Sequence, residues 1–485
     1  MPFRTLIVLS EPTIGRLLGP GGLAELEGPE TYYVASERLA QDSSWEQLGR
    51  LQCYLGELVG RDAKHYYAAA DRATWAHGRR RVFNFRVTLR LVPAPLKRRA
   101  LLEGLPGVYR YAIRRHARHM APNPAAHALL RRLRPDVVIA SAYAMSGRYA
   151  ALDLVAAARE LGIPSLFVQT NWDYLTGSCF PVLPDYLAAW GPQSIQEAVN
   201  IHGFDRDHVF AVGSPHFQRY FDLAPSTAQS PFPFKYALFA GTWSPFDERA
   251  PIEAIDRTIE RLGLGLKLVY RPYPGRAPRK RGDFVDERAL KHVVIDPDRR
   301  DEYLAAFDAG DQTARVKGAF HKLEYLPALL ANAEFIVCPM TTVMLEAALF
   351  DKRVVVPAYN DGINQDQPFD ELVAMDHIKG IRDIEHFALA QSPEEVSEQF
   401  ERAARSPSLP PGSLRDHPVI RRWLYYDTRP YAQRLREVVE LIVERHAGTS
   451  SIETARRRRG RRAAPATPPR RSEQPRASAA RGSSR

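Results

Sequence analysis

The feature that most constrains the fold is an alternation of strand-like and helix-like segments that occurs twice along the chain. In the first series, strand patterns at 135–142 and 163–170 flank a helical pattern at 146–162. The alternation restarts at 236–242 and continues through apolar runs such as 334–339. Strands and helices that alternate with short connections form a parallel sheet with helices on both faces. The sequence therefore predicts an α/β fold with two doubly wound, Rossmann-like domains.

The two series are separated by LAPSTAQSPFPFK, whose Pro and Ser content is typical of a linker. Residues 44–75 have apolar residues at helical spacing, and further helical patterns follow the second series. The predicted organisation is an N-terminal Rossmann-like domain at 1–222, a linker at 223–235, a C-terminal Rossmann-like domain at 236–384, helices at 385–447 and a disordered basic tail at 448–485.

The composition is that of a globular protein, with 45% hydrophobic and 25% charged residues. Cys53, Cys179 and Cys338 are far apart, which argues against both a disulfide framework and a cysteine-ligated metal site. No apolar run reaches the roughly 18 residues of a membrane-spanning helix. We therefore expect a cytoplasmic protein.

Most of the formal net charge of +11 comes from the tail, which has eleven arginines and two glutamates. The tail has little to bury, so we expect it to be disordered. It is either a solubilising extension or an attachment to an anionic membrane surface, such as the inner face of the cell membrane. No aromatic residue lies among the arginines to stack on bases, which argues against nucleic acid as a partner.

Ligands of doubly wound folds bind at the carboxyl ends of the parallel strands, so two such domains place a site in the cleft between them. The most informative segment is CPMTTVMLEAALF, 338–350, where a strand passes into a helix. Thr341 or Thr342 is a candidate cap of this helix, and Glu346 lies near its start. This pattern fits a nucleotide site, and it also fits a simple capped helix.

The run ANAEFIVCPMTTVMLEAALFDKRVVVP resembles the donor-side segment of GT-B glycosyltransferases. The first-domain run from FVQTNWDYLTG to VGSPHFQRYF is similar to a segment of bacterial surface-polysaccharide transferases and CDP-glycerol-type glycerophosphotransferases. Together these matches cover about residues 135–220 and 320–360. The resemblance implies a GT-B fold, with the first domain on the acceptor side and the second binding a nucleotide-activated donor.

By position, the resemblance implies that Glu346 holds the donor ribose and that Thr341 and Thr342 meet the diphosphate. Arg271 follows a strand and is a candidate phosphate ligand or a surface arginine in a proline turn. Two further donor-side candidates, Gly241 and Thr242, either let the backbone approach the donor or form a tight turn.

A transfer of this kind needs a general base for the acceptor hydroxyl. Asp173 follows a first-domain strand and is one candidate, although Asp in such a loop often caps a turn. His216 and His377 are the rival bases. Beside Asp173 on the acceptor side, Asn171 is a candidate contact and Trp172 a candidate platform for a sugar ring.

Motifs for other chemistries are missing from the sequence. It contains no GxGxxG, Walker A, HExxH or GxSxG pattern. The GT-B resemblance itself implies metal independence. We expect no metal and no cofactor, with the nucleotide-sugar acting as a substrate.

The sequence thus favours a glycosyltransferase that moves a sugar, or a glycerophosphate-like group, to a cell-surface glycan or lipid-linked acceptor. Two alternatives stay open. One is a UDP-sugar 2-epimerase-like enzyme, which shares the fold. The other is a non-catalytic nucleotide-sugar-binding or assembly protein that retains the GT-B shell.

Overall fold

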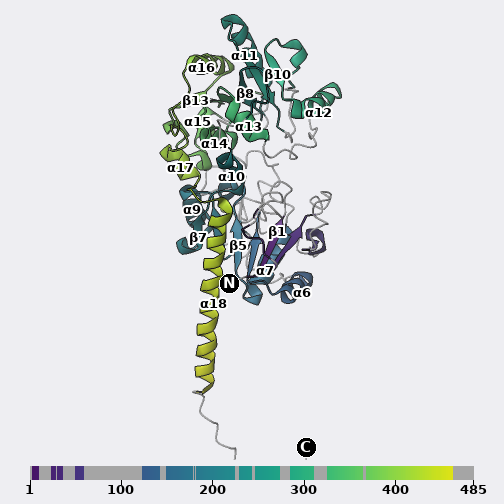
Figure 1. Ribbon diagram of the computed structural model, residues 1–485, viewed down its shortest axis with the longest axis vertical. Coiled ribbons are helices and arrows are strands. Elements are labelled where there is room, and N and C mark those ends of the chain that lie inside the picture. Colours follow the sequence, from purple (N-terminus) through teal and green to yellow (C-terminus); the bar gives the residue numbers. More distant parts are fainter. Residues whose placement is uncertain are drawn as a thin grey trace, which may run out of the picture.

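Two parallel β-sheets form the framework of the computed structural model (Figure 1). The structure describes residues 3–9, 23, 25–28, 30–36, 50–58, 123–141, 149–177, 180, 182–223, 229–242, 246–273, 284–310, 325–363 and 368–462. Side chains are described within these ranges except at residues 149, 150, 152 and 449–462. The arginine-rich stretch before residue 123 and the end of the tail lie outside them.

The first sheet has seven strands in the order β3-β2-β1-β4-β5-β6-β7. All neighbouring strands are parallel. The strands are β1 (Thr5–Leu9), β2 (Thr31–Ala35), β3 (Leu51–Tyr54), β4 (Val137–Ala140), β5 (Ser165–Val168), β6 (Tyr186–Ala189) and β7 (Val209–Ala211). Residues 51–54 were expected to be helical, but they pair with β2 as the edge strand of this sheet.

Helices surround the first sheet. They are α6 (Pro124–Leu133), α7 (Tyr149–Leu161), α8 (Tyr174–Gly177), α9 (Pro192–Glu197) and α10 (Pro215–Asp222), and α9 continues into a π-helical turn at Ala198–His202. Short 3-10 turns lie at Leu55–Leu58 and Arg206–His208. Pro is the first residue of α6, α9 and α10, a position where its missing N–H costs nothing. Ser214 caps α10 by accepting a hydrogen bond from the His216 amide.

The second sheet has six parallel strands in the order β10-β9-β8-β11-β12-β13. The strands are β8 (Tyr236–Ala240), β9 (Lys267–Arg271), β10 (Val293–Ile295), β11 (Ile336–Val337), β12 (Val354–Pro357) and β13 (Phe387–Ala390). In the first sheet β1 lies between β2 and β4, and in the second sheet β8 lies between β9 and β11. This is the doubly wound strand order of Rossmann folds. This confirms the predicted fold class.

The helices of the second half are α11 (Arg249–Leu262), α12 (Pro297–Asp308), α13 (Tyr325–Asn332), α14 (Val343–Leu349), α15 (Phe369–Val373), α16 (Pro393–Arg405), α17 (Pro418–Trp423) and α18 (Tyr431–Arg462). Three 3-10 turns occur at Glu287–Ala289, Asp376–Ile378 and Ile381–Asp383.

Two predicted boundaries move. Residues 385–447 were assigned to helices outside the second domain, but β13 within them pairs with β12 and belongs to the second sheet. The tail was expected to be disordered from 448, but α18 continues as a helix to Arg462. Its sequence contains no proline before Pro465, so nothing breaks the helix earlier.

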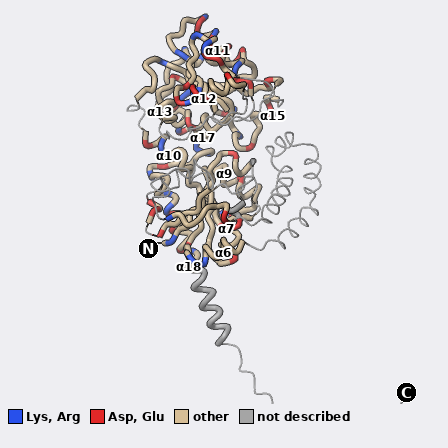
Figure 2. Tube along the Cα trace, turned by 90° about the vertical axis from the view of Figure 1, so that its right-hand side faces the viewer, with Lys and Arg blue, Asp and Glu red and all other residues tan. Residues whose placement is uncertain are grey.

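The chain returns to the first domain after completing the second. Tyr431, Leu435, Val439 and Ile442 of α18 are buried with Ile7 and Ile139 against one face of the first sheet. Figure 1 shows α18 running down beside this sheet. The helices α9, α10 and α17 lie where the two domains meet in both views (Figures 1 and 2). One apolar cluster, which includes Trp172, Trp190, Phe217 and Trp423, continues across this junction.

Two glycines at strand ends make room for the returning chain. A Cβ on Gly191 would lie 2.7 Å from the Trp423 carbonyl oxygen, and one on Gly213 would lie 2.4 Å from the Tyr425 carbonyl oxygen. Gly213 also has a φ of +87°, which favours glycine. The Tyr425 amide donates to the Trp190 carbonyl at 2.7 Å. The segment that follows α17 is therefore held directly against the carboxyl ends of β6 and β7.

Candidate active site

Glu346 forms a direct polar contact between the two domains. It lies in the first turn of α14, just after β11, and is 2% exposed. Its Oε1 lies 2.9 Å from His216 Nε2, and its Oε2 accepts a hydrogen bond from the Tyr220 hydroxyl. His216 and Tyr220 are one turn apart on α10, so they lie on one face of that helix. Segments that follow the carboxyl ends of both sheets thus meet at one carboxylate.

Arg219, on the same face of α10, completes the network. Its NH2 lies 3.2 Å from His216 Nδ1. A guanidinium can only donate, so Nδ1 accepts and the ring carries its proton on Nε2, which donates to Glu346. Both nitrogens of His216 are occupied, and its predicted role as a general base is not available in this arrangement. The structure gives His216 a bridging role instead.

The environment of Glu346 favours the carboxylate form. Burial raises its pKa, but the interactions with His216, the hydrogen bond from Tyr220 and the charge of Arg219 outweigh burial and lower the pKa overall. Glu346 was predicted to hold a ribose, which stays a prediction. Both of its oxygens already have partners, so a bound ribose would share or displace them.

Thr341 and Thr342 lie in the turn before α14, but the predicted helix cap is absent. Thr342 occupies the N-cap position without a side-chain hydrogen bond to the helix. The Thr341 hydroxyl is buried and has no oxygen or nitrogen partner within the described part of the chain. A buried hydroxyl without such a partner is costly. This group would gain from an added ligand, although its predicted contact with a diphosphate stays untested.

Arg271 ends β9 and is committed to the fold. Its guanidinium donates to Asp296 and to Asp298, at 3.1 Å for the latter, and lies over the Tyr325 ring. Arg271 is only 8% exposed. The predicted phosphate contact is therefore replaced by an internal ion-pair network that joins β9 to the start of α12.

Gly241 and Thr242 follow β8, next to β11 at the point where the strand order of the second sheet reverses. A Cβ on Gly241 would lie 2.8 Å from a Glu248 carboxylate oxygen and 3.1 Å from the Tyr273 amide. The Thr242 amide donates to Glu248 at 2.8 Å. The close approach that requires glycine is thus to Glu248 and the neighbouring loop, and both residues serve the local turn.

On the first-domain side, a buried glutamine fixes the loop after β5. The Gln169 side-chain Nε2 donates to the backbone carbonyls of Asn171 and Trp172 at 3.1 and 3.3 Å. Its Oε1 accepts a hydrogen bond from the backbone N–H of Trp190 at 3.0 Å. Asp173, the next residue, is exposed. The loop therefore presents Asp173 to solvent from a rigid support.

Trp172 has a packing role. It is 4% exposed and lies edge-on to the rings of His377 and Trp423, with centroids 5.3 and 4.9 Å away. The ring has little free surface, so the predicted sugar platform is corrected to a contact between domains. His377 is brought next to Asp173, whose charge raises its pKa, but burial dominates and lowers it. Its imidazole is therefore neutral at physiological pH.

Two residues of α9 at this junction were not predicted. Gln193 Nε2 donates across the junction to the carbonyls of Asp376 and His377, at 2.9 Å each, and lies 3.0 Å from Glu197 Oε1. Burial, helped by the charges of Asp376 and Asp173, raises the pKa of Glu197 to about 8. An i, i+4 pair of polar residues is common on helices, so no sequence signal singled it out.

Tyr273 was also missed. It follows β9 and is the exposed large hydrophobic side chain of the described residues, at 39%. Its pKa is raised by burial of the hydroxyl, and Arg299, Asp173 and Glu346 are near enough to influence it electrostatically. Tyr273 therefore lies between groups of both domains.

Within the described ranges, no cluster of His, Cys, Asp and Glu side chains has the arrangement of a metal site. A search of the same residues for a helix long and apolar enough to cross a bilayer found none.

Two Rossmann-type domains that meet through segments after the carboxyl ends of their strands define the GT-B class of fold, to which this protein belongs. No protein-family model matches the chain, and no curated protein sequence is significantly similar.

Several solved structures are similar in outline. S. aureus MnaA with UDP has 12% identity and a TM-score of 0.46, covering 91% of this chain and 97% of that one. UDP-GlcNAc 2-epimerase from Methanocaldococcus jannaschii has 12% identity and a TM-score of 0.46, covering 90% and 99%. Acinetobacter baumannii MurG has 14% identity and a TM-score of 0.43, covering 91% and 99%. Similarity at this level does not assign an activity.

Proposed function

We propose that the protein is a glycosyltransferase that moves a sugar, or a glycerophosphate-like group, from a nucleotide-activated donor to a cell-surface glycan or lipid-linked acceptor. The observation that carries the proposal is the convergence of segments after the carboxyl ends of both sheets at the His216–Glu346 contact. Such strand ends are where doubly wound domains bind nucleotides.

On the donor side, the proposal uses Glu346 for the ribose and the turn at Thr341 and Thr342 for the diphosphate. The buried Thr341 hydroxyl supports this, because it has the Cys338 sulfur beside it but no oxygen or nitrogen partner among the described residues, and a phosphate oxygen would supply one. Arg271 has no part in the proposal because Asp296 and Asp298 already neutralise it.

On the acceptor side, Asp173 and His377 are the remaining candidate bases. Asp173 is exposed and held by a loop that Gln169 fixes. The neutral imidazole of His377 is chemically able to accept a proton. In the proposed reaction, one of them takes the proton of the acceptor hydroxyl as that oxygen attacks the anomeric carbon of a sugar donor, or the phosphorus of a glycerophosphate-like group. The bond from that atom to the nucleotide phosphate breaks, and the nucleotide leaves with its phosphate charge.

The proposal is tested by incubating the protein with UDP-, CDP- and GDP-activated donors, with and without a membrane extract, and measuring the released nucleotide. Acceptor-dependent release supports a transferase. Formation of an epimerised sugar identifies the epimerase alternative, and binding without turnover identifies a non-catalytic protein. Asp173→Asn should lower turnover while donor affinity persists, and exposed Asp207→Asn is the matched control.

We also propose peripheral attachment to the inner face of the cell membrane through the arginine-rich end of the chain. Its support is the sequence alone, since eleven arginines follow residue 447. Co-sedimentation with vesicles that contain an anionic lipid tests it. Loss of binding on truncation after residue 447 is expected, and binding that survives truncation contradicts it.

A further inference from the structure

A second candidate binding region lies at the C-terminal end of α14, away from the turn with Thr341 and Thr342. A cavity of about 890 Å³ is bounded by the end of α14 and by the segments on either side of α17. Ligand pockets are commonly about 300 to 1,000 Å³ in volume. The walls are partly apolar, with Leu349, Phe350, Leu409 and Pro411, and partly charged.

Two arginines of the lining lie over one aromatic pair, buried Tyr426 and partly buried Phe221. The Arg421 guanidinium carbon lies 3.8 Å from the centroid of the Tyr426 ring. Arg415 lies 5.8 Å from the same ring and 5.2 Å from Phe221, which packs against Tyr426. Stacking occupies the face of a guanidinium and leaves its N–H groups at the edge, and the buried Tyr426 ring fixes its orientation. Arg421 also hydrogen-bonds the Tyr426 side chain, which leaves the rest of its five N–H donors available.

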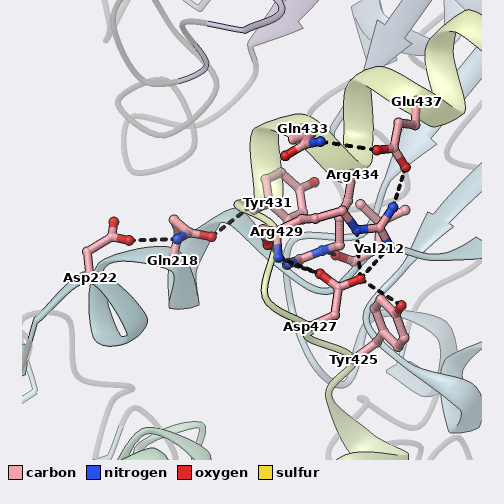
Figure 3. Close-up of polar contacts among 10 residues, drawn as sticks. All are labelled: Val212, Gln218, Asp222, Tyr425, Asp427, Arg429, Tyr431, Gln433, Arg434 and Glu437. Atoms are coloured by element: carbon pink, nitrogen blue, oxygen red, sulfur yellow. Dashed lines mark hydrogen bonds and ion pairs between the residues drawn. The ribbon is translucent and has the colours of Figure 1, made fainter.

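Most of the nearby negative charge is already paired. Asp427 accepts hydrogen bonds from Tyr425 and Arg429 and forms an ion pair with Arg434 (Figure 3). Asp351 accepts from the amides of Gly412 and Leu414, at 2.8 Å each. These bonds also hold the wall of the cavity in place.

The two stacked arginines are different. Neither forms an ion pair with a carboxylate among the residues for which the structure gives side chains. Asp416 is the third carboxylate of the lining, and no side-chain partner holds it. The cavity therefore presents two oriented guanidinium groups against one available carboxylate, beside apolar walls.

We propose that this cavity binds an anionic saccharide, with a phosphate or carboxylate group held by Arg415 and Arg421. Guanidinium groups match the paired oxygens of these anions, and the volume exceeds what a lone inorganic ion needs. The apolar walls suit the C–H faces of a sugar ring. The choice of a saccharide rests on the proposed function, whereas the choice of an anion rests on the cavity alone.

The test is isothermal titration calorimetry of the full chain with glucose 1-phosphate, glucuronate and neutral glucose. Binding of either anion but not of glucose is expected, and the comparison of the two identifies the preferred acid group. Arg421→Gln should weaken binding about tenfold or more, and exposed Arg415→Gln about three- to tenfold. Arg257→Gln on the exposed face of α11 is the matched control and should change nothing.

Arg421→Lys separates a loss of binding from a loss of packing. It keeps a cation on the Tyr426 ring but removes the two-pronged geometry of the guanidinium. It should melt like the wild type and still bind more weakly. The proposal is overturned if neither anion binds at millimolar concentration, if both arginine variants bind normally, or if excess UDP displaces the anion. Nucleotide binding, measured separately on the same protein, shows whether the donor site of the proposed function exists.

Discussion

His216 and Glu346 are 130 residues apart in the sequence, and their side chains meet at 2.9 Å between the two domains. Glu346 is charged and buried, and it keeps that charge because α10 supplies both of its hydrogen-bond donors. The carboxylate predicted for donor binding is thus also a polar connection between the domains. Donor binding and domain arrangement are therefore expected to depend on each other.

The His216–Glu346 contact should be measurable as a coupling energy. His216→Ala leaves a buried carboxylate short of a donor and should lower the free energy of unfolding by about 1 to 3 kcal/mol. In a double-mutant cycle with Glu346→Gln, the two effects should not add, because both variants break the same contact. Additivity within about 0.5 kcal/mol, measured by urea unfolding, would show that the contact is not significant.

Arg271 is expected to act on stability. Arg271→Ala leaves Asp296 and Asp298 without their shared cation and should cost about 3 to 5 kcal/mol of unfolding free energy. Arg257→Ala, an exposed arginine of the same domain, should change it by less than about 0.5 kcal/mol. If Arg271→Ala unfolds like the wild type but loses affinity for nucleotide-sugars, the original phosphate assignment is restored.

Glu197 predicts a pH dependence of stability. Its pKa is about 8 in the folded protein and 4.5 ordinarily, so the folded state binds a proton that the unfolded state releases. The stabilisation is complete below about pH 4.5 and is lost as pH rises through about 8. Glu197→Gln lacks this loss.

Between pH 5 and pH 9 the wild type should therefore lose stability relative to Glu197→Gln. The difference between their free energies of unfolding should change in favour of the variant. Because one pKa unit corresponds to about 1.4 kcal/mol, the change should reach several kcal/mol. Exposed Glu398→Gln is the control. A difference that stays constant with pH would show that Glu197 is ionised in the folded protein.

Gly213 should tolerate no side chain. Gly213→Ala combines a φ of +87° with a Cβ 2.4 Å from the Tyr425 carbonyl oxygen. Gly203→Ala is the matched control, since it has a φ of +77° but open space around the Cβ. The control should lose about 1 kcal/mol from backbone strain alone. Gly213→Ala should lose clearly more in thermal unfolding, and equal losses would mean that the returning chain can shift.

The architecture was predictable from the sequence because period and length identify buried strands well. Two of the edge strands, β3 and β13, were not predictable in this way. Leu51–Tyr54 lies in a helical pattern, and Phe387–Ala390 is a short run before a strong helix, so only pairing with β2 and β12 makes them strands. The tail helix was missed because its composition suggests disorder, whereas its lack of proline up to residue 464 permits a helix.

For the site, sequence reasoning located the right segments but not the partners of their side chains. It selected Glu346 and His216 separately and could not predict their contact, because that contact depends on how α10 packs against α14. It offered Arg271 as a phosphate ligand or a surface arginine. It missed the ion pairs of Arg271 because Asp296 and Asp298 follow another strand, and their distance from Arg271 is not encoded locally. Residues that act through tertiary contacts, such as Gln193, left no local signal.

The central claim is that a nucleotide-activated donor binds where the domains meet. Isothermal titration calorimetry with UDP, CDP, GDP and their sugars measures this directly. We predict that one nucleotide family binds. Glu346→Gln should weaken its binding about tenfold or more, whereas exposed Glu398→Gln should not change it. Thr341→Val, which leaves the His216–Glu346 contact intact, should also weaken nucleotide binding. If no nucleotide binds, or if a folded Glu346→Gln variant binds as tightly as the wild type, the account is wrong.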